Sequence, residues 1–260
     1  MIRSFIKKSL TEENQCRIRR CLYQIGCYPN IKSTYLNNNF TKHIHKEDVK
    51  IIFELGSRDL LDALCLSRFY NAKVFAFECN PDSILLCRRN AAISSNVSLI
   101  EKAVWDKNEK IKFYPVVESY EMSNPNLKHK NIGASSCFRQ CDDYHEKLVQ
   151  SEIKVDAVRL DDFCKENRIT SIDLICMDLQ GASLHAFRGL GNLLKKVNYI
   201  ITELEDQPIY IGQDCYKEVF AYLKDFCFEQ ISSSRPKSIT GEPDPWSDYL
   251  FINRSGKRSL

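Results

Sequence analysis

The sequence of 260 residues lacks the features that mark several classes of protein. No stretch approaches the roughly 18 consecutive apolar residues that a membrane-spanning helix needs, so we expect no transmembrane segment. Residues 1–8 have no apolar core of the length found in secretory signals, and a solvated first helix is the simplest interpretation. We therefore expect a cytoplasmic protein.

Patterns that indicate structural metal sites are also missing. The chain has 12 cysteines, but no two have the Cys-x-x-Cys spacing, and Cys137 and Cys141 lack a second pair or suitably spaced histidines. Without a signal sequence, these cysteines are expected to be thiols in a reducing compartment. An excess of one charge is absent as well, because a formal net charge of +3 gives little support for a nucleic-acid-binding protein.

What is present is the composition of a soluble globular protein, with 43% hydrophobic and 27% charged residues. A chain of this length builds one elaborated domain more readily than two. We predict an N-terminal helical extension over residues 1–45, with an apolar stripe at Ile18, Leu22 and Ile25, and a main domain over residues 46–260. The extension either caps a ligand pocket or pads the sheet, and padding is the simpler interpretation.

The main domain is organised around residues 51–78. Residues 51–55 read as a buried strand that ends in a turn at Gly56, residues 60–69 have helical periodicity, and residues 73–77 read as a second strand. A unit of about 30 residues fits a helix that connects two parallel strands. Glu78 follows roughly 20 residues beyond the turn, where a carboxylate can accept hydrogen bonds from both hydroxyls of a ribose.

A single glycine turn is also compatible with a purely structural connection. The three-glycine fingerprint of dinucleotide-binding proteins is absent, because Arg58 and Asp59 stand where further glycines would let a pyrophosphate approach. This disfavours nicotinamide and flavin dinucleotides. A nucleoside attached to an amino acid does not need a bare helix terminus, so a nucleoside site and a structural turn are the two alternatives at this point.

The rest of the chain extends the alternation of strands and helices. Further strands are predicted at residues 97–100, 172–177, 199–202, 228–231 and 249–252, and the last two are connected without a helix. Residues 107–160 interrupt the pattern as a β-rich insertion, interpreted as either a substrate-recognition segment or a surface addition. We predict a Rossmann-like α/β fold with a seven-stranded, mostly parallel sheet and an antiparallel last strand.

Acidic residues stand at or near the ends of four predicted strands, namely Glu54, Glu78, Asp178 and Glu203. The carboxyl ends of parallel strands meet at one edge of the sheet, where such folds bind ligands, so these side chains are expected to share a site. Capping of the next helix is the structural alternative for Asp178. Trp105, beyond the third strand, either covers a bound base ring or packs in the core.

At these positions the chain resembles the FkbM-type family of S-adenosylmethionine-dependent methyltransferases. The resemblance covers roughly residues 50–205 and rests on an ordered series of motifs: FELGSRD at 53–59, FAFECNP at 75–81, EKAV at 101–104, VRLDDF at 158–163, IDLICMDLQGA at 172–182 and YIITE at 199–203. The family usually has a second small residue after the first turn, where this chain has Arg58 and Asp59. It usually has glutamate where this chain has Gln180.

The resemblance implies a class I methyltransferase fold, S-adenosylmethionine as cofactor, and methylation of a hydroxyl on a sugar, glycan or related small molecule. Glu78 would hold the ribose, and Glu54 and Gly56 would shape the methionine side. The full set of implied cofactor-binding residues is Glu54, Gly56, Ser57, Arg58, Asp59, Glu78, Cys79, Asn80, Ala103, Val104 and Asp178. Assembly as a homodimer is a further expectation.

Catalytic residues are implied in the same way. Asp178 is the first candidate for the general base that removes the hydroxyl proton. Glu203 could join Asp178 around a divalent ion, and oxygen ligands would favour magnesium or manganese. His185, in the following helix, is an alternative base, although a lone histidine there is more often a surface residue.

Two other functions stay open. An RNA or other nucleic-acid methyltransferase would use basic residues near the pocket mouth, for which Arg58, Lys128, Lys130 and Arg139 are the candidates. A non-catalytic nucleoside-binding module on the same fold would keep Glu78 but tolerate a changed Asp178. The presence of both acids together with Glu203 favours an enzyme.

Overall fold

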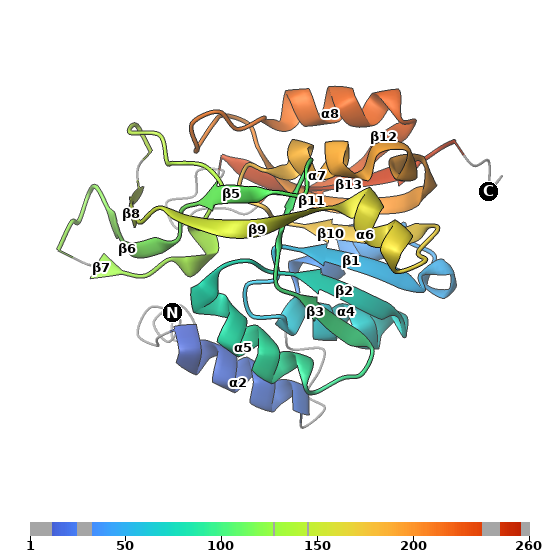
Figure 1. The fold of residues 1–260 in the computed structure, drawn as a ribbon, viewed down its shortest axis with the longest axis horizontal. Coiled ribbons are helices and arrows are strands. Elements are labelled where there is room, and N and C mark those ends of the chain that lie inside the picture. Colours follow the sequence, from blue (N-terminus) through green and yellow to red (C-terminus); the bar gives the residue numbers. More distant parts are fainter. Residues whose placement is uncertain (1–11, 25–32, 127, 145, 236–244, 256–260) are drawn as a thin grey trace.

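The computed structural model describes residues 12–24, 33–126, 128–144, 146–235 and 245–255. Its centre is a seven-stranded sheet in the order β12-β13-β11-β10-β1-β2-β3 (Figure 1). These strands are β1 (Ile51–Leu55), β2 (Lys73–Phe77), β3 (Val97–Ile100), β10 (Ile172–Met177), β11 (Val197–Glu205), β12 (Phe228–Ser234) and β13 (Trp246–Asn253). The last strand, β13, is antiparallel to β11 and β12, and the other neighbouring pairs are parallel.

This topology confirms the predicted class I methyltransferase fold. The chain runs outward from β1 through β2 to β3, and then returns to the other side of β1 to add β10 and β11. The strand order therefore reverses between β1 and β10, and α/β sheets bind ligands at the carboxyl edge beside such a reversal.

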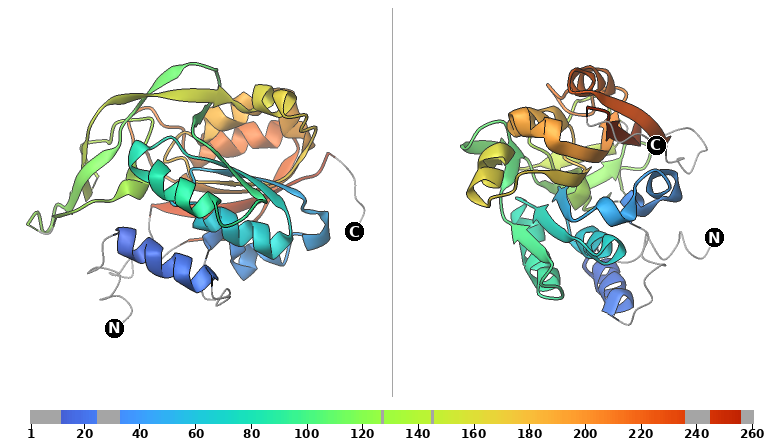
Figure 2. Two further views of the ribbon diagram at one scale, coloured as in Figure 1. Left: turned by 60° about the horizontal axis from the view of Figure 1, so that its bottom comes forward. Right: turned by 90° about the vertical axis from the view of Figure 1, so that its right-hand side faces the viewer.

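Helices cover both faces of the sheet. On one face lie α4 (Leu61–Tyr70) and α5 (Pro81–Ala91), together with α2 (Glu12–Gln24), as Figures 1 and 2 show. On the opposite face lie α6 (Leu160–Glu166), α7 (Ser183–Leu190) and α8 (Tyr216–Asp225). The sheet is thus the middle of three layers, as expected for parallel strands that are buried on both sides.

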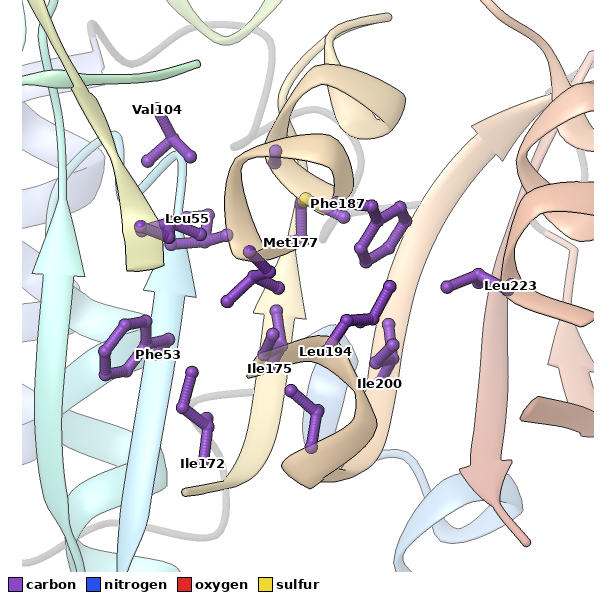
Figure 3. Packing of buried hydrophobic residues seen from close by; sticks show 14 of the residues in the cluster. Phe53, Leu55, Val104, Ile172, Ile175, Met177, Phe187, Leu194, Ile200 and Leu223 are labelled. Atoms are coloured by element: carbon purple, nitrogen blue, oxygen red, sulfur yellow. The ribbon is translucent and has the colours of Figure 1, made fainter. Parts of the chain in front are cut away.

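Successive residues of the central strands point to opposite faces, and this divides the core into two clusters. Ile52 packs in the cluster beneath α4, whereas Phe53 and Ile175 pack toward α7 in the cluster that Figure 3 shows. Glu54 has the same parity as Ile52, so its side chain leaves β1 on the α4 face of the sheet.

Six strands between residues 103 and 159 form two small additional sheets. One contains β4 (Ala103–Trp105), β5 (Lys110–Phe113) and β9 (Ile153–Arg159), and the other contains β6 (Val116–Glu121), β7 (Lys128–His129) and β8 (Glu146–Gln150). A short 3-10 helix, η3 (Ile132–Ala134), follows β7. Five of these strands lie within the β-rich insertion predicted at residues 107–160, and β4 precedes it.

The described part of the N-terminal extension contains α2, η1 (Thr34–Leu36) and α3 (Asn38–Thr41), and η2 (Lys46–Asp48) follows it. It contacts α4, where the Arg68 guanidinium lies 4.0 Å from the centre of the Tyr23 ring, and β12, where Asn37 Nδ2 donates to Ser234 Oγ at 3.1 Å. Residues 1–11 and 25–32, which include the expected first helix, lie outside the described residues.

Two expectations about the chain as a whole have structural counterparts. Among the residues that the structure describes, no helix is both long enough and apolar enough to span a membrane. Ten cysteines in the same part of the chain carry thiols rather than disulfides, as expected.

Candidate active site

A cleft of about 230 Å³ lies at the carboxyl edge of the sheet, beside the reversal of strand order. Most of the residues predicted to form the site line this cleft: Glu54, Gly56, Ser57, Arg58, Glu78, Cys79, Asn80, Ala103, Val104, Asp178 and Glu203. Asp59 and His185 are not among the lining residues. The acids at the ends of β1, β2, β10 and β11 are therefore brought together, because parallel strands end at one edge.

The turn after β1 brings two strand ends into contact. Gly56 has φ of +87°, and both its N–H and that of Ser57 donate to the carbonyl oxygen of Phe77 on β2 at 3.0 Å. Ser57 Oγ donates to Glu54 Oε2 at 2.5 Å, which fixes the Glu54 carboxyl group at the floor of the cleft. Burial raises the pKa of Glu54 well above its usual value, and the nearby Asp62 carboxylate adds to this effect.

Glu78 is held by backbone donors on both of its oxygens. Oε1 accepts from the N–H of Cys79 at 2.8 Å and of Asn80 at 2.7 Å, while Oε2 accepts from the N–H of Arg58 at 2.7 Å. Burial raises the pKa of Glu78, and the three N–H donors oppose that rise because they stabilise the ionised form. A buried carboxylate in one fixed orientation is suited to recognition of vicinal hydroxyl groups.

Asp59 has a structural position outside the cleft. Its Oδ1 accepts from the backbone N–H of Leu61 at the start of α4, and its Oδ2 accepts from Arg19 Nη1 on α2, both at 3.0 Å. The side chain therefore caps α4 and ties α2 to it. Arg58, in contrast, lines the cleft, and its positive charge lowers the pKa of Asp178 against the effect of burial.

Asp178 and Glu203 share one hydrogen-bond donor, the amide of Gln180. Gln180 Nε2 lies 2.6 Å from Asp178 Oδ1 and 3.4 Å from Glu203 Oε1, and Gln180 Oε1 accepts from the hydroxyl of Tyr210 at 2.7 Å. Gln180 has φ of +48°, a left-handed backbone conformation that turns its amide back toward the strand ends. Gln180, which stands where the family usually has glutamate, therefore lies between the two acids.

Both carboxyl groups of this pair have raised pKa values. Removal from water raises the pKa of Asp178, while the Gln180 hydrogen bond lowers it in part. Removal from water also raises the pKa of Glu203 well above its usual value, and repulsion by Asp178 is the next cause. Two carboxyl groups that repel one another favour a state in which only one of them is ionised.

These residues do not fit a magnesium ion. No group of three or more histidine, cysteine, aspartate or glutamate side chains in the described ranges is arranged to hold a metal. Gln180 Nε2, an N–H donor, points at both Asp178 and Glu203, where a cation would require electron-pair donors. The predicted magnesium site at this pair is not supported.

His185 lies elsewhere. Its ring is stacked on that of Trp105, with centroids 3.6 Å apart, and its Nδ1 is 3.0 Å from Asp106 Oδ2. Trp105 therefore packs against His185 and against Phe138, at a centroid distance of 5.9 Å, and is also absent from the lining of the cleft.

The β-rich insertion forms a cover over the cleft. Ser135 Oγ accepts from Asn80 Nδ2 at 3.2 Å, next to Glu78, and Ser136 Oγ donates to the carbonyl of Gln180 at 2.7 Å. The segment around η3 is thus attached at the ends of both β2 and β10. Phe113, Ile132, Gly133, Ser135 and Cys137 from this insertion line the cleft.

The sequence pattern missed several lining residues, among them Gln180, Lys102, Asp62 on α4, and Thr34 and Tyr35 in the extension. The interpretation that the extension only pads the sheet is therefore wrong. The alternation of side chains along β1 could have pointed to Asp62 and Tyr35, because it directs Glu54 to the α4 face, where both residues lie.

The ionisable side chains of the cleft are predominantly acidic. Among the described residues, five carboxyl side chains line it (Glu54, Asp62, Glu78, Asp178 and Glu203), against the two basic side chains of Arg58 and Lys102. A ligand that carries positive charge is favoured at such a site.

Comparison with known proteins agrees with the resemblance. A family model described as the methyltransferase FkbM domain matches residues 54–229. The chain is also similar to the 2-O-methyltransferase NoeI of Sinorhizobium fredii, at 29% identity over 246 residues that cover 92% of this chain and 95% of that protein.

Among solved structures, TrmK of M. capricolum in complex with S-adenosyl-homocysteine has 12% identity and a TM-score of 0.48, covering 88% of this chain and 72% of that chain. An rRNA methylase from Streptococcus thermophilus has 12% identity and a TM-score of 0.43, covering 80% and 88%. These distant similarities carry no information on the substrate. The family match spans most of the chain and includes the acids at all four strand ends, so the protein belongs to the FkbM methyltransferase family and is an S-adenosylmethionine-dependent methyltransferase.

Proposed function

We propose that the protein methylates a hydroxyl oxygen of a sugar, glycan or related small molecule. The observation that carries the proposal is the row of carboxyl groups along the sheet edge, with Glu78 at one end and the pair of Asp178 and Glu203 at the other. Glu78 at the first end would bind the nucleoside of the cofactor, and the pair at the second end would remove the hydroxyl proton of the acceptor.

The end near β2 fits the nucleoside part of the cofactor. Three backbone N–H groups fix the Glu78 carboxylate, and Oε2, which accepts only one of them, keeps a lone-pair site for a ribose hydroxyl. Phe77, Ala103 and Val104 line the cleft beside Glu78 and offer apolar surface for a base ring. This arrangement supports the assignment of Glu78 to ribose binding.

The charge of the cleft also fits the cofactor. When bound, S-adenosylmethionine supplies an activated methyl group on a positively charged sulfur. The predominantly acidic lining favours a ligand with that charge, and Glu54 lies between the two ends of the row.

The pair of Asp178 and Glu203 would act as the general base. Asp178 accepts the proton of the acceptor hydroxyl, and the Gln180 amide keeps its carboxylate oriented toward the cleft. Burial raises the pKa of both carboxyl groups, and the charge of Asp178 raises the pKa of Glu203 further, so the pair takes up a proton more readily than an isolated aspartate.

A nucleic-acid substrate is less well supported. Three of the four basic residues that would favour it contact carboxylates: Lys128 pairs with Glu118 at 2.9 Å, Lys130 with Asp82 at 2.8 Å, and Arg139 with Glu152 at 3.1 Å. The name of the similar protein, a 2-O-methyltransferase, supports methylation of an oxygen.

Calorimetric titration with S-adenosylmethionine tests the cofactor site. We expect binding by the wild type and a loss of at least about tenfold in affinity for Glu78→Gln, because the substitution removes a charged acceptor. Glu101→Gln is the matched control, since Glu101 follows the neighbouring strand but pairs with Arg88 at 2.6 Å outside the cleft. Equal affinity in all three proteins would reject the assignment of Glu78.

Methyl transfer from labelled S-adenosylmethionine to a panel of nucleotide sugars and glycans tests the acceptor class. RNA belongs in the same panel. Label in a sugar hydroxyl that depends on Asp178 would support the proposal, whereas label in RNA alone would reject it.

A further inference from the structure

The extension that precedes the family match contributes directly to the cleft. Its 3-10 helix η1 supplies Thr34 and Tyr35 to the lining, although the match with the family model begins only at residue 54. This wall lies on the α4 face of the sheet.

Tyr35 is placed deep in this wall. Only 5% of the residue is exposed, and no hydrogen bond to its hydroxyl is seen among the described residues. Burial raises the pKa of the hydroxyl well above its usual value, and Asp178, Cys176, Glu54 and Asp62 are the negatively charged or ionisable groups that raise it further. A tyrosine hydroxyl in a cavity wall that has no hydrogen-bond partner in the described part of the chain is available to a ligand.

The carboxyl groups of Glu54 and Asp62 come from different elements and line one corner of the cleft. Glu54 leaves β1 on the α4 face, and Asp62 lies in the first turn of α4. Both line the cleft, and after burial the charge of Asp62 is the next cause of the raised pKa of Glu54. Two acids placed together in a cavity are costly unless a cation joins them.

Helix α2 reinforces this corner from outside. Arg19 Nη2 lies 3.4 Å from Asp62 Oδ1, and Arg19 Nη1 lies 3.0 Å from Asp59 Oδ2. Arg19 lowers the pKa of Asp62 against burial, so it favours the ionised form. The ability of Glu54 and Asp62 to bind a cation therefore depends on Arg19 in the extension as well as on the main domain.

We propose that Asp62 and Tyr35, together with Glu54, bind the amino-acid end of S-adenosylmethionine, so that the N-terminal extension is part of the cofactor site. The inference rests on the proposed function. Its chemistry is specific: the ammonium group lies between the two carboxylates, and the Tyr35 hydroxyl hydrogen-bonds the same end of the cofactor. The ribose is held separately, by Glu78 on the opposite side of Gly56.

Two ligands that differ at this end test the inference. S-Adenosylhomocysteine contains the amino-acid end, whereas 5′-methylthioadenosine has the nucleoside and sulfur without it. Calorimetric titrations of the full chain would compare the wild type with Asp62→Asn and Tyr35→Phe, which keep the shape of each side chain. Tyr23→Phe is the matched control, because Tyr23 is a buried tyrosine of the same extension that does not line the cleft.

We expect Asp62→Asn to weaken S-adenosylhomocysteine about tenfold or more, and Tyr35→Phe about threefold to tenfold, the range for one lost hydrogen bond. Affinity for 5′-methylthioadenosine should stay within about twofold, since it makes none of these contacts. The Tyr23→Phe control should leave both affinities unchanged, and thermal unfolding would verify that each variant is folded.

Equal weakening of both ligands would show that the corner only supports the fold and would overturn the inference. Unchanged affinity for S-adenosylhomocysteine in both variants would overturn it as well. Failure of the wild type to bind either ligand is a different result, which would overturn the proposed function and this inference with it.

Discussion

Gly56 lies directly against the backbone of Asp178: a Cβ added to Gly56 would be 2.0 Å from the Asp178 carbonyl oxygen. The ends of β1 and β10 therefore touch, and the turn that carries the cofactor-site residues is positioned by the strand that carries the proposed base. No side chain fits at position 56 without separating these two strand ends.

Substitution of this glycine should be severely destabilising. Gly56→Ala introduces the clash with Asp178 and places alanine at φ of +87°, and we expect a loss of about 3 kcal/mol or more in the free energy of unfolding. Urea denaturation measures it. Gly212→Ala is the control, because Gly212 has φ of +84° but no atom within 4 Å of an added Cβ, so it should lose only about 1 kcal/mol. Equal losses would show that the contact with Asp178 is unimportant.

Asp178 and His185 can be separated as candidates for the base. Asp178→Asn should lower kcat about 10²- to 10⁴-fold, the usual contribution of a general base. His185→Asn should change kcat by less than about threefold, because the ring faces Asp106 and Trp105 rather than the cleft. Steady-state kinetics with the acceptor from the panel decides, and the reverse ranking would make His185 the base.

Gln180 should set the pH range of activity. Its N–H bond to Asp178 stabilises the ionised carboxylate and so lowers the pKa of that group. Gln180→Met keeps the volume but removes the donor, so the ascending limb of the pH–rate profile should move to higher pH. Tyr210→Phe, which alters the other side of the amide, should move it less, since the Gln180 contact with Asp178 remains. An unmoved limb in Gln180→Met would refute the shared-donor arrangement.

Glu205 makes stability depend on pH. Burial raises its pKa from 4.5 to about 7, with the Asp178 charge as the next cause. The folded state therefore holds the proton more tightly than the unfolded state, so stability falls as pH rises from about 4.5 to about 7 and is lowest above that window.

Glu205→Gln removes this titration. The variant should match the wild type near pH 4 and exceed it near pH 8 by up to about 3 kcal/mol, as measured by urea denaturation at both values. Glu101→Gln should show no gain at pH 8, because its ion pair with Arg88 lowers rather than raises the pKa. A Glu205→Gln variant no more stable than wild type at pH 8 would contradict the prediction.

Much of the fold follows from local pattern. The apolar stretches at 51–55, 73–77, 97–100 and 172–177 are strands in the structure, and their buried character predicted a parallel sheet with helices on both faces. The position of Glu54, Glu78, Asp178 and Glu203 along one edge followed as well, because every parallel strand ends on the same side.

Other features of the site depend on contacts between distant segments. Asp59 and Arg58 are neighbours in sequence, yet Asp59 caps α4 and contacts Arg19 while Arg58 lines the cleft. Nothing in the local pattern distinguishes them, because the difference arises from the left-handed backbone at Arg58, with φ of 48°, and from the packing of α2.

The sequence by itself determined the succession of strands along the chain, the turn at Gly56 and the row of acids, since each depends on the periodicity and chemistry of a few neighbouring residues. Only the tertiary structure decided that Tyr35 and Asp62 join Glu54, that Gln180 lies between Asp178 and Glu203, and that His185 turns toward Trp105. These relationships join residues that are far apart along the chain, and their geometry comes from how the extension, the insertion and the helices pack on the sheet.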